Sequence, residues 1–183
     1  KQNNIVWDPR APTLYHVLRD EREHDPRRRY KALLDTAERW LATSPDGFDW
    51  TLLDVSPIPS DDESHFFYDP YNDQFAAMVK HSTEWGRSVW LSTSNDFQSF
   101  SEAKLVFHTD SKDRDIGQER IQQVLDDPDY LSPPLVDDFK HIAQAYHMAV
   151  LPYEGLYVGF ALILNPSSII PPPWSNYTGL NQI

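Results

Sequence analysis

The sequence predicts an all-β protein built from repeated units of four short antiparallel strands. Residues 40–50 and 90–100 carry Trp, Leu, Thr, Ser, Asp and a closing aromatic residue at matching positions, with a constant offset of 50. Apolar, β-favouring segments precede both copies, and a third hairpin pattern follows near position 150. Four-stranded antiparallel units that repeat in this way are the signature of β-propeller blades. A β-sandwich is the alternative for many short strands, but a sandwich has no reason to repeat its sequence.

The first unit ends its third strand in a turn that its side chains specify. Ser44 and Asp46 favour a turn because their side chains bond to nearby backbone amides. Gly47 can supply a positive φ at this point without steric cost, and Trp50 then opens an outer strand. The predicted strands before this turn cover residues 13–18, 29–34 and 40–43.

The second unit follows the same plan with a shorter first hairpin. Residues 70–73 form a polar hairpin turn between two apolar, β-favouring segments. Ser94 and Asp96 repeat the turn of the first unit, and Phe100 takes the place of the closing Trp50. The predicted strands of this unit cover residues 65–69, 74–80 and 90–93.

A third unit and one inserted helix complete the organisation. Strands at residues 146–151 and 156–163 flank a turn at 152–155, whereas residues 115–125 place apolar side chains at helical spacing. We therefore predict a short helix between the second and third units. The whole chain is expected to be one domain, a fragment holding about three propeller blades. The expected blade units cover residues 13–60, 61–110 and 141–183.

Charge and composition limit the partners. The net charge is −12, so a polyanion is repelled, and neither nucleic acid nor a membrane surface is expected to bind. Without cysteine, the chain forms no disulfide and no thiolate metal site. No apolar run reaches the length of a membrane span. Because the sequence begins with Lys1 rather than Met, a leader is expected to have been removed or to lie outside it. A secreted or periplasmic location is slightly favoured.

Several motifs resemble those of the five-bladed propeller glycosidases, the superfamily of the invertase, levansucrase and arabinanase groups. The similarity extends over most of residues 29–160 and is greatest to bacterial proteins labelled glycosyl hydrolase family 32/43-like. It implies five blades, with a site at the central axis on the innermost strands. Carboxylates from successive blades then act as nucleophile or base, as transition-state stabiliser and as general acid. The motifs that carry the resemblance lie at residues 29–33, 44–50, 67–70 and 152–159.

The resemblance places the second carboxylate of that set just before the strand at 65–69. Counting back from this strand puts Glu63 at the acidic position, with Asp61 and Asp62 beside it. The Arg and Pro that usually flank the carboxylate are absent here, so a solvated acidic loop stays open as the alternative. The first carboxylate would come from near the strand at 13–18 or from sequence before Lys1. Asp8 is the one acidic residue close upstream of that strand.

The general acid of the family corresponds to Tyr146, which is not a carboxylate. The neighbouring His147 can take the acid role because the pKa of a histidine lies near neutrality, although a structural histidine is the alternative. The predicted catalytic residues are therefore Glu63, Asp62 and His147, and the predicted substrate-binding residues are Asp61, His65, Tyr146 and Arg87. Three further carboxylates are assigned to turns rather than to the site: Asp46, Asp69 and Glu154.

The resemblance implies a glycoside hydrolase-like protein that acts on fructosyl- or arabinosyl-type oligosaccharides. A non-catalytic carbohydrate-binding propeller is the alternative, favoured by the missing carboxylate at Tyr146, and a protein-binding propeller is a third possibility. No cofactor is expected. Some relatives carry a calcium ion at the axis, so a structural calcium is possible, but the spacing of His16, His65, His141 and His147 matches no metal motif.

Overall fold

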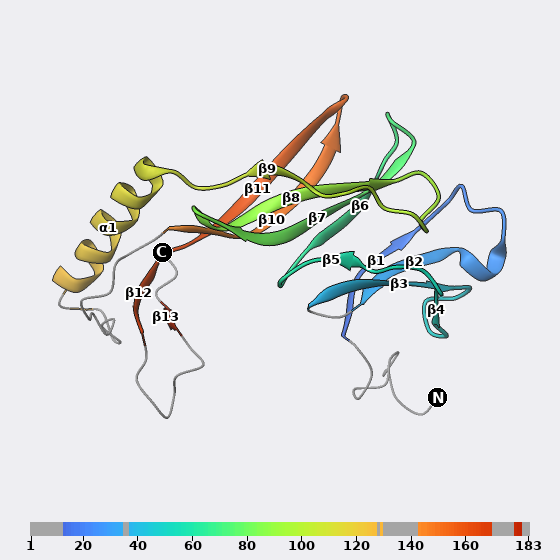
Figure 1. Cartoon of the computed structure of the whole chain (residues 1–183), viewed down its shortest axis with the longest axis horizontal. Helices are drawn as coiled ribbons and strands as arrows, with labels where there is room; N and C mark the ends of the chain where they lie inside the picture. The colour runs from blue at the N-terminus through green and yellow to red at the C-terminus, as the bar shows by residue number, and fades with distance from the viewer. Residues whose placement is uncertain (1–12, 35–36, 128, 130–142, 170–177, 181–183) are drawn as a thin grey trace.

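A computed structural model describes residues 13–34, 37–127, 129, 143–169 and 178–180. Its main elements are two antiparallel sheets and a long hairpin, arranged one after another along the molecule (Figure 1). The predicted all-β class with one helix is confirmed. In the part of the chain that the structure describes, no helix is long and apolar enough to cross a membrane.

The first sheet has the order β1-β2-β3-β4, with β5 paired to the start of β3. The second sheet has the order β6-β7-β8-β9, so each sheet follows the chain from one edge to the other. The bounds are β1 Leu14–Arg19, β2 Tyr30–Leu34, β3 Glu38–Ser44, β4 Thr51–Leu52, β5 Ile58–Pro59, β6 His65–Asp69, β7 Gln74–Thr83, β8 Gly86–Ser94 and β9 Lys104–Phe107.

The described strands of the third unit form two separate two-stranded sheets rather than one. A hairpin of β10 (Gln144–Tyr153) and β11 (Leu156–Leu164) forms its own two-stranded sheet, and β12 (Pro166–Ile169) pairs with β13 (Thr178–Leu180). A 3-10 turn, Pro26–Arg28, lies in the link between β1 and β2. The third sheet as described therefore ends after its second strand.

The helix α1 spans Ser111–Asp126, which makes it longer than the predicted 115–125. Its start is fixed by a reciprocal cap: the Asp110 carboxylate accepts from the amides of Lys112 and Asp113, and the Asp113 carboxylate accepts from the Asp110 amide at 2.9 Å. Apolar spacing alone does not reveal this cap, because the capping residues are polar and precede the apolar face.

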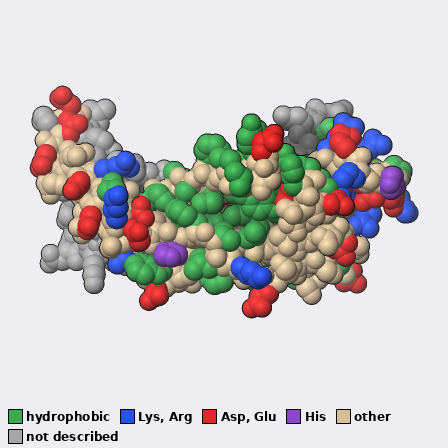
Figure 2. Space-filling model, turned by 90° about the horizontal axis from the view of Figure 1, so that it is seen from above, with side chains coloured by type: hydrophobic (Ala, Val, Ile, Leu, Met, Phe, Trp, Pro, Cys, Tyr) green, Lys and Arg blue, Asp and Glu red, His purple; other side chains and the backbone are tan. Residues whose placement is uncertain are grey.

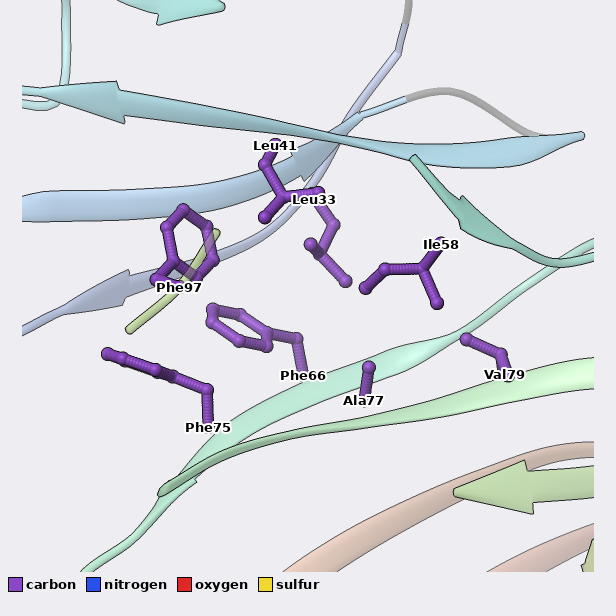
Figure 3. Packing of buried hydrophobic residues seen from close by; sticks show 8 residues of the cluster. All are labelled: Leu33, Leu41, Ile58, Phe66, Phe75, Ala77, Val79 and Phe97. Carbon is purple, nitrogen blue, oxygen red and sulfur yellow. The ribbon is translucent and has the colours of Figure 1, made fainter. Parts of the chain in front are cut away.

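The first strands of the three units lie next to one another, since β6 contacts both β1 and β10. The two sheets pack face to face around one buried cluster, and Figure 3 shows Phe97 between side chains of the first sheet and side chains of the second. The second sheet buries its other face against the hairpin. The first cluster consists of Leu33, Leu41, Ile58, Phe66, Phe75, Ala77, Val79 and Phe97.

The repeated turns have the same hydrogen bonds, as the sequence predicts. Ser44 donates to Asp46 at 3.1 Å, and Ser94 donates to Asp96 at 2.9 Å. The carboxylate of each Asp then accepts from the amides two and three residues further along the chain. The turn assignment of Glu154 also agrees with the structure, because Glu154 has a φ of 50° between β10 and β11. Asp69 caps its hairpin turn by accepting from the Tyr71 amide.

Candidate functional site

Three histidines meet where the first strands of the units lie side by side. His16 comes from β1, His65 from β6 and His147 from β10. The ring centroids are 5.1 Å apart for His16 and His65, 6.4 Å for His16 and His147, and 6.5 Å for His65 and His147. Each unit thus contributes one imidazole to the same place.

Two β-bulges coincide with this cluster. The register of β1 shifts between Tyr15 and Val17, and the register of β10 shifts between Ala145 and His147. A bulge leaves one residue without a partner and turns its side chain in a new direction, which is frequent beside active sites. His16 is the unpaired residue of the first bulge, and Tyr146 is that of the second.

Backbone carbonyls fix two of the imidazoles. The Nε2 of His16 bonds to the carbonyl of Ser64, and the Nε2 of His65 bonds to the carbonyl of Val150 at 3.0 Å. Because a carbonyl oxygen can only accept, Nε2 carries the hydrogen in both rings, and Nδ1 is the acceptor of each neutral ring. Burial lowers the pKa of both histidines, and the nearby His16 lowers that of His65 further.

Glu63 pairs with the third imidazole. Its Oε2 lies 3.7 Å from the Nδ1 of His147, with side-chain exposures of 40% and 24%. Burial lowers the pKa of His147, while the charge of Glu63 acts in the opposite direction. His147 is therefore neutral near pH 7, and in that state it accepts a proton more readily than it gives one.

An ion pair between the buried Lys80 and Asp62 lies beside Glu63 and His147. The Nζ of Lys80 is 3.1 Å from Asp62 Oδ2, and its side chain is only 3% exposed. The same Nζ lies 4.4 Å from the ring centroid of Tyr146. Burial lowers the pKa of Lys80, and Asp62 opposes this effect. Burial also raises the pKa of Tyr146, as do the charges of Glu63 and Asp62.

Arg87 and Gln144 border this group from the start of β8 and the start of β10. The guanidinium of Arg87 donates to Gln144 Oε1 at 3.3 Å and lies 5.9 Å from the Tyr146 ring. Asp61 is directed elsewhere, since its carboxylate accepts from the Ser82 amide at 3.1 Å and lies 3.8 Å from His81 Nδ1.

The structure therefore gathers six of the seven predicted site residues and leaves Asp61 outside the group. The six are Asp62, Glu63, His65, Arg87, Tyr146 and His147. The candidate first carboxylate, Asp8, lies outside the described residues. Sequence reasoning gave no site role to His16 or Lys80, which join the group. His16 could have been found by its place in a first strand, the same place that His65 has.

Buried groups from the first sheet support the segment before β6 that carries Glu63. Arg39, fully buried on β3, donates from Nε to the hydroxyl of Ser64 at 2.6 Å. Its guanidinium also lies 5.2 Å from the Tyr15 ring. These contacts link the first sheet to the segment between Glu63 and His65. The backbone carbonyl of Ser64 in turn accepts a hydrogen bond from His16.

The arrangement brings together groups suited to proton transfer and polar contacts. Among the described residues, no three side chains of His, Asp, Glu or Cys are placed to hold a metal ion. The possible calcium site stays a prediction. The group offers a carboxylate–imidazole pair, a buried ammonium and an aromatic ring at one place.

Comparison with known proteins gives no match: no family model, no curated protein and no solved structure resembles this chain closely enough to be significant.

Proposed function

We propose that the sheets are blades of a five-bladed propeller and that the chain is glycoside hydrolase-like, acting on fructosyl- or arabinosyl-type oligosaccharides. The observation that supports this best is the Glu63–His147 pair, which lies where the first strands of the three units converge. In a propeller, the first strand of each blade is the innermost one, so a substrate at the axis would meet these side chains.

Cleavage of a glycosidic bond needs a proton donor for the leaving oxygen and a basic or nucleophilic group on the other face of the sugar. In this proposal the protonated His147 gives its proton to the leaving oxygen, while a water molecule attacks the sugar carbon from the other face and releases its own proton to solvent. Glu63 stabilises the imidazolium form of His147 before the transfer. The lowered pKa of His147 makes it a base near pH 7 and an acid only at lower pH. The proposal therefore implies greater hydrolysis on the acidic side of neutrality.

The remaining residues are proposed to hold the sugar. Tyr146 presents an aromatic ring, and Arg87 presents hydrogen-bond donors beside it. Asp62 keeps the ammonium of Lys80 in place. Sugar hydroxyls both donate and accept, and the mixture of charged and aromatic groups suits them.

A second candidate function is carbohydrate binding without hydrolysis. Two observations favour it: Tyr146 occupies the position where the resemblance places an acid, and Asp62 is engaged by Lys80. The same sugar contacts would then serve recognition alone.

Hydrolysis and binding can be measured on the same panel of fructosyl and arabinosyl oligosaccharides, by release of reducing ends and by calorimetry. We expect Glu63→Gln and His147→Gln each to lower the hydrolysis rate by at least about 100-fold, the usual contribution of general acid–base catalysis, while binding changes little. Glu154→Gln is the matched control, because that exposed carboxylate lies in the β10–β11 turn.

The outcomes separate the two functions. Binding without turnover, unchanged by Glu63→Gln, supports the recognition function. Neither binding nor turnover of any glycan in the panel would overturn both.

A further inference from the structure

Arg87 is held in one orientation at the start of β8. Its backbone amide and its Nη1 both donate to Oε1 of Gln144, at 3.2 and 3.3 Å. Gly86 makes this arrangement possible, because a Cβ at Gly86 would lie only 2.8 Å from Cγ of Gln144. A side chain that is already fixed loses less conformational entropy when it binds a ligand. The guanidinium of Arg87 is therefore preorganised for binding.

The other edge of this guanidinium is free. Within the residues that the structure describes, Nε and Nη2 of Arg87 have no hydrogen-bond partner, and no carboxylate lies within ion-pair distance of the group. These two nitrogens form a planar fork of N–H donors, which matches a pair of anionic oxygens. Because the side chain is half-buried, a ligand can reach the fork, while water screens the contact less than at an exposed site.

The guanidinium lies on the side of β8 that faces the candidate site. Val89, two residues along β8, belongs to the cluster buried against the β10–β11 hairpin, and alternate residues of a strand share a face. Arg87 lies 5.9 Å from the ring centroid of Tyr146 on β10. Burial lowers the pKa of Lys80, and the charge of Arg87 lowers it further. The positive charge of Arg87 therefore acts on the groups of the site.

The charged side chains around Tyr146 balance one another except at Arg87. Lys80 lies 3.1 Å from Asp62, and His147 lies 3.7 Å from Glu63. In the proposed function His147 acts when it is protonated, and the carboxylate of Glu63 then balances its charge. One positive charge remains in this state, on the guanidinium that has a free edge. An anionic group of the substrate would balance it.

The net charge of −12 opposes the binding of an anion at long range. Acidic side chains are distributed along the molecule, however, and Figure 2 shows them along the length of one face, around hydrophobic side chains in the middle. At physiological salt, charges more than about 8 Å apart are largely screened. A long polyanion still meets the whole surface, whereas a single anionic group mainly meets the side chain that it contacts.

We infer that the oligosaccharide bound at the candidate site is acidic, and that Arg87 binds its carboxylate or sulfate group through Nε and Nη2. A uronosyl unit would supply the carboxylate, and a sulfate ester is the other source of the same chemistry. Gln144 is then a positioning residue, since it holds the opposite edge of the guanidinium. The inference rests on the proposed function, because it assigns a substrate class to the same site.

Calorimetry with four matched ligands tests this inference. The ligands are a neutral arabinosyl or fructosyl oligosaccharide, the same oligosaccharide with a terminal glucuronosyl unit, the methyl ester of that acid, and a sulfate ester of the neutral form. We expect the better of the two charged ligands to bind at least about tenfold more tightly than the methyl ester, because a bidentate contact between charged groups is stronger than one between neutral groups. Comparison of the two charged ligands identifies the source of the anion.

Two variants test the role of the fork through the ratio of the dissociation constants for the methyl ester and the charged ligand. Arg87→Lys keeps the charge without the planar fork, so the ratio should fall to about two- or threefold. Gln144→Glu keeps the acceptor for Arg87 and adds a carboxylate beside the guanidinium, so the ratio should fall to about one, because the charge is then balanced within the protein. Thermal unfolding shows whether each variant folds.

Arg27→Gln is the matched control. This exposed arginine pairs with Asp25 in the link between β1 and β2, and its replacement changes the net charge as Gln144→Glu does. The tenfold preference should persist in this variant. If it is lost here as well, the preference reflects net charge, and the inference is wrong.

The remaining outcomes separate this inference from the proposed function. Equal affinity of the unaltered chain for the charged and uncharged ligands overturns the inference, while hydrolysis or binding of those ligands still supports the proposed function. A full preference that survives both Arg87→Lys and Gln144→Glu overturns it too, because another group then binds the anion. If none of the four ligands binds, the inference and the proposed function fail together.

Discussion

The turn after β3 and the turn after β8 share their hydrogen bonds and differ in the residue next to the aspartate. In both turns a serine donates to an aspartate, which accepts from two backbone amides. The next residue has a positive φ in both: 81° at Gly47 and 55° at Phe97. A Cβ at Gly47 would come no closer than 4.0 Å to the Tyr30 ring, whereas Phe97 is fully buried.

This difference shows that the polar side chains determine the conformation of the turn. The residue at the positive φ determines whether the turn also packs a side chain between the sheets. A left-handed backbone costs an ordinary residue roughly 1–2 kcal/mol. Truncation of a buried phenylalanine costs about 3–5 kcal/mol, so burial outweighs strain at Phe97. The first turn avoids the strain with glycine, and the second accepts it to join the two sheets.

Phe97→Ala is expected to give the largest effect. It keeps the strained φ and removes the ring that contacts both sheets, so we expect a loss of about 3–5 kcal/mol in the free energy of unfolding. Denaturant titration measures this loss. Phe48→Ala in the other turn is the control: its side chain is 53% exposed, and its loss should stay below about 0.5 kcal/mol. Similar losses for the two variants would contradict the comparison.

Sequence reasoning identified these two turns but not their different roles. The Ser and Asp side chains and Gly47 are readable because each has a local backbone preference. The burial of Phe97 depends on the first sheet packing against the second, which local patterns do not encode. The alternation of residues 65–69 predicts the strand with its observed bounds. The apolar spacing does not predict the start of α1, because the capping residues are polar and precede the apolar face.

Prediction of the candidate site from the sequence has the same limit, because local patterns do not show which strands lie side by side. Glu63 and His147 were chosen by counting along motifs, and their approach to 3.7 Å depends on β6 lying beside β10. Lys80 was missed because its strand reads as an apolar core strand, and its charge is compensated by Asp62 from a separate loop. Asp61, adjacent in sequence, points to the end of β7 instead.

Gly47→Ala measures the free-energy cost of a positive φ for a residue other than glycine in the first turn. The added methyl group meets no close atom, so the cost should come from the positive φ alone, about 1–2 kcal/mol. Thermal and denaturant unfolding of the variant measure it. A neutral or stabilising result would show that the backbone at this turn relaxes to a negative φ, and the assumed cost at Phe97 would then be too high.

Replacement of the two aspartates should change stability by amounts that differ less than those for the two residues at the positive φ. Asp96→Ala and Asp46→Ala each remove two hydrogen bonds to backbone amides. We expect Asp96→Ala to lower Tm by about 2–4 °C, the shift that 1 kcal/mol gives in a domain of this size, and Asp46→Ala to lower it less. The reason is that only the second turn positions a buried ring. Calorimetry of both variants at pH 7 decides the order, and a larger shift for Asp46→Ala would reverse the argument.

The smallest expected difference is in the pH dependence of the free energy of unfolding. The turns and the histidine cluster lose their contributions to stability in separate pH ranges. Bonds from backbone amides lower the pKa of Asp46 and Asp96 below 3.8 in the folded chain. Their contribution is therefore complete above about pH 4 and disappears as the pH falls through the folded pKa values.

The histidines also lose their contribution to stability as the pH falls, but in a higher pH range than the aspartates. Burial lowers the pKa of His16, His65 and His147 below 6.5. The unfolded chain therefore binds more protons just below pH 6.5, and stability falls as the pH drops from about 6.5 through the folded pKa values. His65→Gln, whose amide can still donate to the Val150 carbonyl, should flatten the loss between pH 6.5 and 5 and leave the loss below pH 4 unchanged. Asp96→Ala should do the reverse. A single variant that flattens both ranges would show that the turn and the histidine cluster titrate as coupled groups, and the proposed separation would be wrong.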